Sequence, residues 1–447
     1  MIEVELLSNL LKKELHCDCG VEHAIPIEVI QISDGIIPEL AQYLTHKKLL
    51  RVLLVADQNT WCVWGQEVAE SLTEFKMSTC IFPGQPKLLP TESALDKVIE
   101  IIDVSDIQVV LAVGSGVIND LVRYATHLQK IPYISLPTAP SMDGYASNVA
   151  PLHISGMKIT KSAHTPIAIF ASIKVLYHSP IEMIQSGFGD LAGKAISIVD
   201  WKLSHLVNDE YFCNEAYQLV LVPVVYCMEN ANKIIERDPN AITNLFIGLI
   251  NAGLAMAMVG NSRPASGSEH LCSHFWDFMM YKSGQSLQSH GVQVGYATHW
   301  MMKFYRETLK IENYQELNGL HISSKQYEWM REFYGQSADA IIQAQMNKVN
   351  QLDHVGNRNN INNLAKIKEN LAYEANLFDR LDDALKTVGI PDEIGFLGLD
   401  KDTLMLTFLH AFELRERYTI FDFLIEQNLL PKFIEKILQT DFQDIEV

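Results

Sequence analysis

The chain has 447 residues, of which 48% are hydrophobic and 20% are charged, so it is long enough for two or three globular domains with buried cores. The net charge of -19 and the pI of about 5.2 argue against nucleic acid and anionic membranes as partners. A phosphorylated substrate is not excluded, because a local basic or amide-lined pocket binds phosphate whatever the overall charge.

The N-terminal segment 1–15 has acidic residues early and no long apolar stretch, so we expect no secretory signal. Of the seven cysteines, five are scattered singly along the chain, which is typical of reduced thiols in the cytosol. We therefore expect a cytoplasmic protein. The five scattered cysteines are Cys62, Cys80, Cys213, Cys227 and Cys272.

The other two cysteines lie in residues 16–23, HCDCGVEH. Cys17, Cys19, His16 and His23 could together form a small zinc site. A Cys-x-Cys spacing is tighter than the usual gap of two to four residues between zinc ligands, however. We favour a β-hairpin with reduced thiols, and the sequence leaves the metal alternative open.

Residues 1–178 are predicted to form an α/β domain with a parallel sheet. Short, β-rich apolar runs alternate there with segments of helical period, such as residues 92–103 and 119–129. The predicted strands begin at residue 26 and continue at residues 51–57, 78–83, 109–114, 133–138 and 166–172.

The fourth predicted strand leads into a glycine turn and then a helix, in LAVGSGVINDLVRY (111–124). Gly114 and Gly116 would let backbone amides approach a pyrophosphate at the start of that helix. The Rossmann fingerprint has a third glycine where Asn119 stands here, so the turn alone is weak evidence for a dinucleotide.

Two further features of this half concern cofactor binding. Asp57 ends the second predicted strand, where a carboxylate either binds ribose hydroxyls, favouring NAD over NADP, or caps the following helix. The segment SLPTAPSMDGYASNVAP (135–151) is rich in serine, threonine and proline around Asp143, which is typical of a binding loop or of a long turn.

Residues 179–447 are predicted to form an all-helical domain, because strand-like runs vanish and long segments of helical period replace them. The uncharged stretch 241–260 is long enough to cross a bilayer. Asn244 and Asn251 interrupt it and no second span exists, so we expect a buried core helix and no membrane span.

Three possible metal ligands in the helical half are Asp190, His270 and His290, of which Asp190 and His290 adjoin a glycine and His270 follows Gly267 by three residues. One carboxylate and two imidazoles are a common ligand set for a catalytic divalent ion. Asp190 could instead serve only as a helix N-cap. His274 follows His270 by about one helical turn, which places both on one face.

The motifs taken together resemble a known family. The glycine loop, PTAPSMDGYAS, GFGDLAGK, NSRPASGSEHLCSH, SHGVQVG and FELRERYTIFDFL follow one another from about residue 20 to 430. In this order they are similar to sn-glycerol-1-phosphate dehydrogenases, most of all the bacterial AraM-type branch, within the iron-containing alcohol dehydrogenase and dehydroquinate synthase superfamily. PASGSEH with SHG is specific, whereas the glycine loop is not.

The resemblance implies a role for each matching position. The metal ligands would be Asp190, His270 and His290, with Asp190 also facing substrate. The substrate contacts and catalytic residues would be Asp143 and His274. The NAD contacts would be Asp57, Gly114, Ser115, Gly116, Val117, Ile118, Thr138, Ser141 and Ser147.

The implied activity is reversible hydride transfer between NADH and dihydroxyacetone phosphate, giving sn-glycerol 1-phosphate for phospholipid synthesis. A zinc or nickel ion would polarise the carbonyl in each subunit of a homodimer. We expect Arg263 and Ser266, just before His270, to hold the phosphate. Ser115, Arg123 and Ser172 depart from the family pattern and leave NADP open as the cofactor.

Three alternatives remain at this point. A metal- and NAD-dependent lyase of the dehydroquinate synthase type would use the same fold without net NADH turnover. A polyol or alcohol dehydrogenase would not require phosphate. A non-catalytic binding protein is disfavoured by the intact Asp190, His270 and His290 set.

Overall fold

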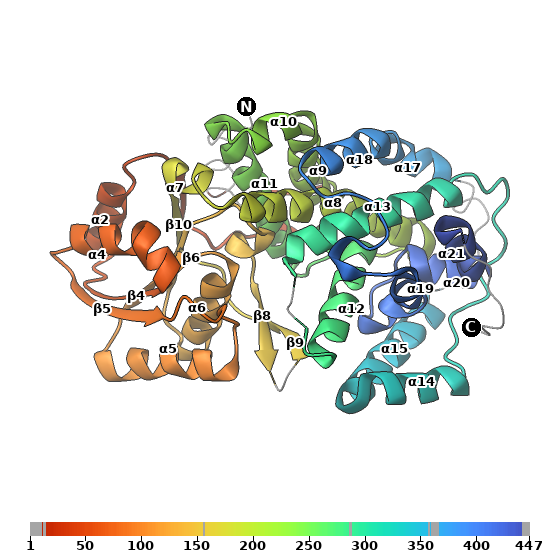
Figure 1. Cartoon of the computed structure of the whole chain (residues 1–447), viewed down its shortest axis with the longest axis horizontal. Helices are drawn as coiled ribbons and strands as arrows, with labels where there is room; N and C mark the ends of the chain where they lie inside the picture. The colour runs from red at the N-terminus through yellow and green to blue at the C-terminus, as the bar shows by residue number, and fades with distance from the viewer. Residues whose placement is uncertain are drawn as a thin grey trace.

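The computed structural model describes residues 11, 15–154, 157–285, 288–355, 358 and 366–439. A sheet covered by helices occupies one end of the elongated molecule, and a larger group of helices occupies the other (Figure 1). The main sheet ends with β10 (Ala168–Ala171), and the first long helix, α8 (Ile181–Asn208), follows it. The predicted boundary after residue 178 falls between these two elements.

The main sheet has six strands, all parallel, in the order β3-β10-β7-β6-β4-β5. All six predicted strands are confirmed, but β3 starts three residues later than predicted because its partner β10 has only four residues to pair with. The remaining strands of the sheet are β3 (Val29–Ile32), β4 (Arg51–Asp57), β5 (Lys76–Phe82), β6 (Val109–Gly114) and β7 (Tyr133–Pro137).

Helices cover both faces of this sheet, which explains why its strands read as continuous apolar runs. Successive side chains of β4 point to opposite faces, so Leu54 packs under one helical layer and Leu53 under the other. The first layer holds α2 (Ile37–His46), α3 (Gln58–Thr60), the π-turn η1 (Trp61–Gly65) and α4 (Gln66–Ser71). The second layer holds α5 (Glu92–Ser105) and α6 (Gly116–Gln129).

Three small elements stand outside the main sheet. Before the main sheet lies the hairpin of β1 (Leu15–His16) and β2 (Glu22–His23). After β7 come the 3-10 turn η2 (Asp143–Ala146) and an antiparallel hairpin of β8 (Val149–Ile154) and β9 (Met157–Ser162). The β8–β9 hairpin lies between the sheet and the helical half (Figure 1).

The described part of the chain contains no strand after β10, which confirms the predicted change to an all-helical half. The helices of this half are α7 (Ile173–Tyr177), α8, α9 (Asn214–Glu229), α10 (Ala231–Ile235), α11 (Pro239–Val259), α12 (Ser268–Lys282), α13 (His290–Thr308), α14 (Ser324–Tyr334), α15 (Ala338–Asp353), α17 (Ile367–Ala375), α18 (Phe378–Thr387), α19 (Lys401–His410), α20 (Ile420–Glu426) and α21 (Leu430–Leu438), with 3-10 turns at η3 (Gly335–Ser337), η4 (Phe396–Gly398) and η5 (Ala411–Leu414).

The apolar segment predicted as a core helix is α11. It is the one described helix that is long and apolar enough to cross a membrane, but 83% of its most apolar window is buried inside the fold. Asn244 is buried too, and its side chain donates to the carbonyl oxygen of Asn240 at 2.7 Å. The helix therefore belongs to the core of the helical half, as expected.

Candidate active site

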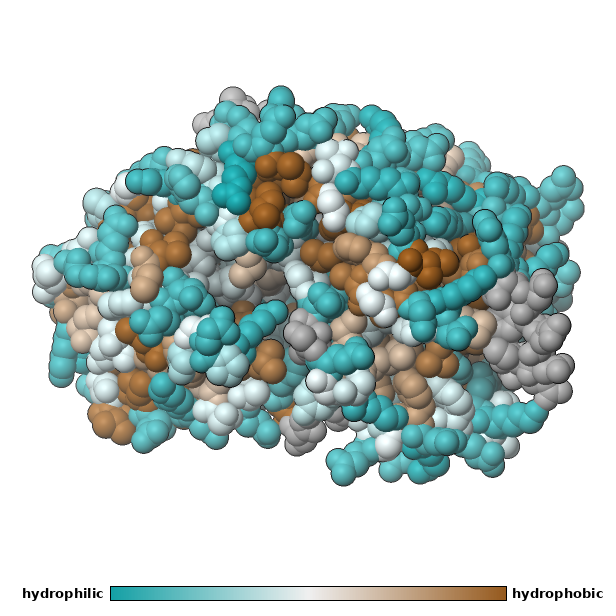
Figure 2. Space-filling view, viewed as in Figure 1, coloured by the Kyte–Doolittle hydropathy of each residue, from teal (hydrophilic) through white to brown (hydrophobic). Residues whose placement is uncertain are grey.

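A cavity of about 330 Å³ lies where the two halves meet, and the surface is hollowed there (Figure 2). Most of that face is hydrophilic, with apolar side chains only in small separate patches (Figure 2). Both halves contribute to the walls, which brings together residues far apart in the sequence. The predicted site residues that line the cavity are Ser115, Gly116, Val117, Ser141, Asp143, Ser147, Ser266, His270, His274 and His290.

The glycine loop joins β6 to α6 at the edge of this cavity. Ser115 is the N-cap of α6, yet its side chain makes no capping hydrogen bond, so the first amides of the helix stay available to an anion. A Cβ on Gly114 would lie 2.6 Å from the Cβ of Ile118, so only glycine permits this tight turn. The strand order reverses between β4 and β6, which is where open α/β sheets bind nucleotides.

Asp57 ends β4 directly beside that crevice. Its Oδ1 accepts a hydrogen bond from the backbone N–H of Thr60 at 2.9 Å, and the Thr60 side chain bonds back to the Asp57 N–H in a capping box. The helix-cap interpretation is thus confirmed. The ribose contact remains a prediction, and it is compatible with the cap because the second carboxylate oxygen is left for other partners.

The predicted dinucleotide contacts after β7 occupy different positions relative to the cavity. Ser141 and Ser147 line it. Thr138 does not, because its side chain is buried and its backbone N–H donates to the carbonyl oxygen of Gly114 at 3.2 Å. Thr138 therefore holds the glycine loop in place from the neighbouring strand.

The three predicted metal ligands converge, although they come from three different helices. Asp190 lies on α8, His270 on α12 and His290 begins α13. One ligand atom from each lies within 4.8 Å of the other two, and the Nε2 of His270 is 3.5 Å from the Oδ1 of Asp190. Asp190 is fully buried inside α8, which begins nine residues earlier, so the N-cap alternative for it is wrong.

The glycines beside these ligands explain how the helices approach so closely. A Cβ on Gly189 would lie 2.1 Å from the carbonyl oxygen of Gly291, and a Cβ on Gly291 would lie 1.8 Å from the carbonyl oxygen of Ser186. Helices α8 and α13 therefore cross at backbone contact. Asp190 follows Gly189 and His290 precedes Gly291, so the crossing itself brings the two ligands together.

Neighbouring side chains hold the rings of His270 and His290 in place. The Nδ1 of His270 lies 2.6 Å from Glu269 Oε1, which also accepts from the backbone N–H of Gly267 at 2.9 Å. A carboxylate can only accept, so His270 carries its proton on Nδ1 and directs Nε2 toward Asp190. Ser273 Oγ lies 3.2 Å from His290 Nδ1 and forms a hydrogen bond with that ring. This donor set fits a divalent cation that keeps coordination positions open.

Lys194 forms the electrostatic centre of the site, and sequence reasoning missed it. Its Nζ lies 2.6 Å from Asp190 Oδ1 and 2.7 Å from Asp143 Oδ2. The backbone N–H of Asp143 donates to the other oxygen of Asp190 at 2.9 Å. Lys194 follows Asp190 by four residues in GFGDLAGK, so the shared helix face was a usable signal.

The two carboxyl groups differ in their electrostatic surroundings. Burial tends to raise the pKa of Asp190, but the charge of Lys194 and hydrogen bonding to His270 hold it well below the usual range. Burial raises the pKa of Asp143, and the nearby charge of Asp190 adds to that rise. Asp190 is therefore the carboxyl group that stays anionic, and Asp143 is the one better placed to hold a proton.

Two arginines that sequence reasoning missed line the opposite wall of the cavity. Arg417 donates to the carbonyl oxygen of Ser266 and, at 2.7 Å, to the hydroxyl of Ser262. Arg415 donates to Thr160 Oγ1 at 3.1 Å. Burial, together with the charges of Arg263 and Arg415, lowers the pKa of Arg417 to about 9. The signal for both was the RER in FELRERYTIFDFL.

Arg263, the predicted phosphate-binding residue, instead forms an ion pair outside the cavity. Its guanidinium donates to the carboxylate of Glu210 at 2.8 and 2.6 Å and to the carbonyl oxygen of Tyr418 at 2.6 Å. Only 4% of its surface is exposed, and it is not among the residues that line the cavity. The expectation for Arg263 is therefore wrong, whereas Ser266 does lie in the cavity wall.

His274 lies one turn beyond His270 and lines the cavity, as its position on the helix predicted. Its ring centre lies 6.2 Å from that of His270 and 5.8 Å from that of His290. His274 thus stands next to the ligand set without belonging to the group of three whose ligand atoms converge.

Comparison with known proteins assigns the chain to a family. Residues 31–180 match the iron-containing alcohol dehydrogenase family. A glycerol-1-phosphate dehydrogenase [NAD(P)+] of Halalkalibacterium halodurans is 40% identical over 317 residues, which cover 69% of this chain and 79% of that protein. The corresponding Geobacillus stearothermophilus protein is 34% identical over 308 residues, covering 68% and 76% of the two chains.

Solved structures agree on the fold. The sulfoacetaldehyde reductase of Bifidobacterium kashiwanohense, solved in complex with NAD+, superimposes with a TM-score of 0.62 at 14% identity over 94% of this chain and 99% of that one. The sequence relatives establish the family, and the solved structures establish the two-part fold. The chain belongs to the glycerol-1-phosphate dehydrogenase family, within the iron-containing alcohol dehydrogenases, and is an NAD(P)-dependent oxidoreductase.

Proposed function

We propose that the protein interconverts dihydroxyacetone phosphate and sn-glycerol 1-phosphate, with NADH as the preferred reductant and a divalent cation held by Asp190, His270 and His290. One observation carries this proposal. The histidines of the ligand set, with Asp190 buried directly behind them, the free N-terminus of α6 and two partly buried arginines all meet at one cavity between the halves.

The cofactors supply the chemistry that side chains lack. Bound NADH supplies the hydride, and a bound zinc or nickel ion supplies Lewis acidity at the substrate oxygen. The amides of Gly116, Val117 and Ile118 at the start of α6 would bind the pyrophosphate. Asp57, at the end of β4, would bind the ribose hydroxyls and repel the extra phosphate of NADP.

The chain's own residues bind and orient the substrate. Reduction of the ketone needs a proton at its oxygen, and Asp143 and His274 both face the cavity beside the ligand set. Lys194 holds Asp143 at 2.7 Å, which fixes the position of that carboxyl group. We assign hydroxyl binding and proton relay to Asp143 and His274.

Arg415 and Arg417 are assigned to the substrate phosphate in place of Arg263. Neither forms an ion pair with any described carboxylate, and both are partly buried in the cavity wall. A phosphate anion in the cavity would give both guanidinium groups a directly bonded charged partner. Ser262 and Ser266 lie beside Arg417 and complete this end of the cavity.

The test compares phosphorylated and unphosphorylated substrates. We expect metal-loaded protein to oxidise NADH with dihydroxyacetone phosphate at a kcat/KM about a hundredfold or more above that with dihydroxyacetone. Similar values for both ketones would instead indicate a polyol dehydrogenase. Folded, metal-loaded protein that turns over neither ketone with NADH or NADPH would reject the substrate and favour a lyase with the same fold.

A further inference from the structure

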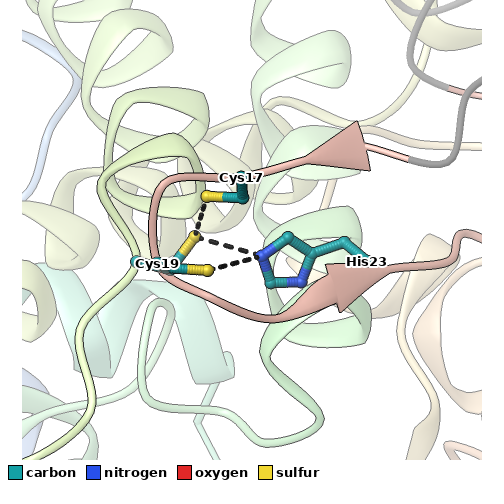
Figure 3. A group of neighbouring side chains, drawn as sticks. Cys17, Cys19 and His23 are labelled. Carbon is teal, nitrogen blue, oxygen red and sulfur yellow. Dashed lines mark hydrogen bonds between the residues drawn. The ribbon is translucent and has the colours of Figure 1, made fainter.

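A second cluster of possible metal ligands lies outside the active-site cavity. Cys17, Cys19 and His23 of the N-terminal hairpin meet Cys213, and one ligand atom from each lies within 4.8 Å of the others. The three hairpin side chains point toward one another across the turn between β1 and β2 (Figure 3). None of the four lines the active-site cavity, so the proposed reaction does not use them.

Three distances within this cluster are close to the edges of a coordination tetrahedron, and the remaining ones are within 4.8 Å. The sulfurs of Cys17 and Cys213 are 3.6 Å apart, and the Nε2 of His23 lies 3.2 Å from the sulfur of Cys19 and 3.4 Å from that of Cys213. Zinc bonds of about 2.3 Å to sulfur and 2.0–2.1 Å to nitrogen put tetrahedral ligand atoms about 3.5–3.8 Å apart. The observed separations require only small adjustments.

The orientation of His23 is that of a metal-binding histidine. Its Nδ1 lies 2.9 Å from the carbonyl oxygen of Met258 in α11, and a carbonyl can only accept. The proton therefore resides on Nδ1, and the lone pair of Nε2 faces the thiols. His23 is 1% exposed, and among the described residues the cysteine sulfurs are the groups that contact its Nε2.

Local structure brings the cysteines into position despite the tight Cys-x-Cys spacing. The backbone N–H of Gly20 donates to the carbonyl oxygen of Cys17 at 3.2 Å, and Gly20 has a φ of +80°, which closes the turn. Cys213 is the N-cap of α9, and its sulfur accepts a hydrogen bond from the backbone N–H of Ala216 at 3.5 Å, which fixes its position at the start of the helix. The hydroxyl of Tyr211 donates to the sulfur of Cys19 at 3.2 Å.

We propose that Cys17, Cys19, His23 and Cys213 bind a structural zinc ion. Three thiolates and one imidazole are a ligand set that zinc prefers, and four protein ligands close the coordination shell, which leaves no position for a substrate. The ion ties the hairpin before the sheet to α9 and, through His23 and Met258, to α11. It fastens the N-terminal end of the chain to the helical half.

A disulfide is the competing use of the same residues. The 3.6 Å between the sulfurs of Cys17 and Cys213 is well beyond a disulfide bond of about 2.05 Å, and all seven cysteines are free. A disulfide would also leave the lone pair of His23 and the thiol of Cys19 unexplained. A shared metal uses all four side chains.

Cobalt titration tests the proposal separately from the proposed reaction. The protein is stripped of metal under reducing conditions, with the His290→Ala substitution disabling the active-site ligand set. Added Co²⁺ should produce thiolate-to-cobalt charge-transfer bands and the strong visible bands of tetrahedral cobalt. These bands should disappear on adding Cys19→Ser or Cys17→Ser and should persist with Cys62→Ser, which replaces an exposed cysteine outside the cluster.

Zinc analysis completes the test. Wild-type protein should hold one more zinc per chain than Cys19→Ser, which should keep dihydroxyacetone phosphate reduction intact. Absence of the cobalt bands from reduced wild-type and His290→Ala protein would overturn the proposal. So would a Cys17–Cys213 disulfide in protein purified from reducing cells without added oxidant. Inactivity toward dihydroxyacetone phosphate alongside normal cobalt bands would reject the proposed reaction and leave this site standing.

Discussion

The ammonium group of Lys194 lies 2.6 Å from the carboxylate of Asp190, and both side chains are completely buried. The same ammonium group contacts Asp143 at 2.7 Å, so one lysine pairs with two carboxyl groups. In metal-free protein, it is the nearest balancing charge for both. Replacing Lys194 should therefore lower the stability of the protein most when no cation is bound.

Lys194→Met should lower the free energy of unfolding by about 3–5 kcal/mol in the presence of a chelator, because it leaves buried carboxyl groups uncompensated. Urea denaturation with and without zinc measures the effect, and zinc should restore part of the loss. Lys303→Met removes a partly exposed pair with Asp392 and should cost no more than about 1 kcal/mol. Equal losses for the two variants would contradict the assigned role of Lys194.

Glu269→Gln should weaken metal binding about 10- to 100-fold, because an amide no longer fixes the tautomer of His270 with a negative charge. A competition assay with a chromogenic chelator measures the change. Asp382→Asn is the matched control, since Asp382 accepts from the Nδ1 of His299 at 2.7 Å away from the ligand set. Equal changes in metal affinity for the two substitutions would show that Glu269 does not orient His270 for the metal.

Gly291→Ala should separate α8 from α13, because the new Cβ would lie 1.8 Å from the carbonyl oxygen of Ser186, which is backbone and has little room to move. We expect a loss of at least about 3 kcal/mol in the free energy of unfolding, together with weaker metal binding as His290 is displaced. Urea denaturation and metal competition report the two effects. Unchanged stability and affinity would show that the helices do not depend on this close crossing.

Arg417→Gln should raise KM for dihydroxyacetone phosphate about 10- to 100-fold, since a charged hydrogen bond to phosphate is lost. KM for unphosphorylated dihydroxyacetone should stay nearly unchanged. Arg306→Gln, which removes a surface pair with Asp379, serves as the control and should alter neither value. A similar rise for both ketones would place the phosphate elsewhere.

His164 should make the protein less stable in mild acid. Burial, with the nearby charge of His127, lowers its pKa from 6.5 to about 4 in the folded state. The unfolded chain therefore binds more protons between these two values, and stability present above pH 6.5 is lost as the pH falls toward 4. Because the ring is partly exposed, we expect about 1 kcal/mol between pH 7 and pH 5.

His164→Gln should remove this part of the acid sensitivity while keeping the hydrogen bond that His164 makes with Thr126 at 3.0 Å. Urea denaturation of both proteins at pH 7 and pH 5 gives the comparison. If wild type and His164→Gln lose the same free energy of unfolding over that range, another group is responsible.

Much of the fold could be predicted because its signals are local. The strands of the main sheet are buried on both faces, so each reads as a short apolar run, and α11 reads as a long one. The end of such a run depends on its partner, which explains the late start of β3. The convergence of Asp190, His270 and His290 rested on a family resemblance, since no local pattern links three separate helices.

The parts that sequence reasoning missed depend on contacts between distant segments. Arg263 precedes His270 by only seven residues, yet Glu210 and Tyr418 draw its guanidinium away from the cavity. Arg417 reaches the cavity from the far end of the chain. Cys213 lies 190 residues after His23, so the sequence alone gives no sign that it belongs with the hairpin. Only the fold places its sulfur next to His23.

Titration of metal-free protein with zinc or nickel tests the central claim most directly. The Cys19→Ser variant is used so that only the active-site ligands contribute, and bound metal and NADH oxidation with dihydroxyacetone phosphate are followed together. The rate should rise in proportion to bound metal, level off at about one ion per chain, and stay at baseline when His290→Ala is added. Full turnover in metal-free protein, or undiminished turnover with His290→Ala, would contradict the account.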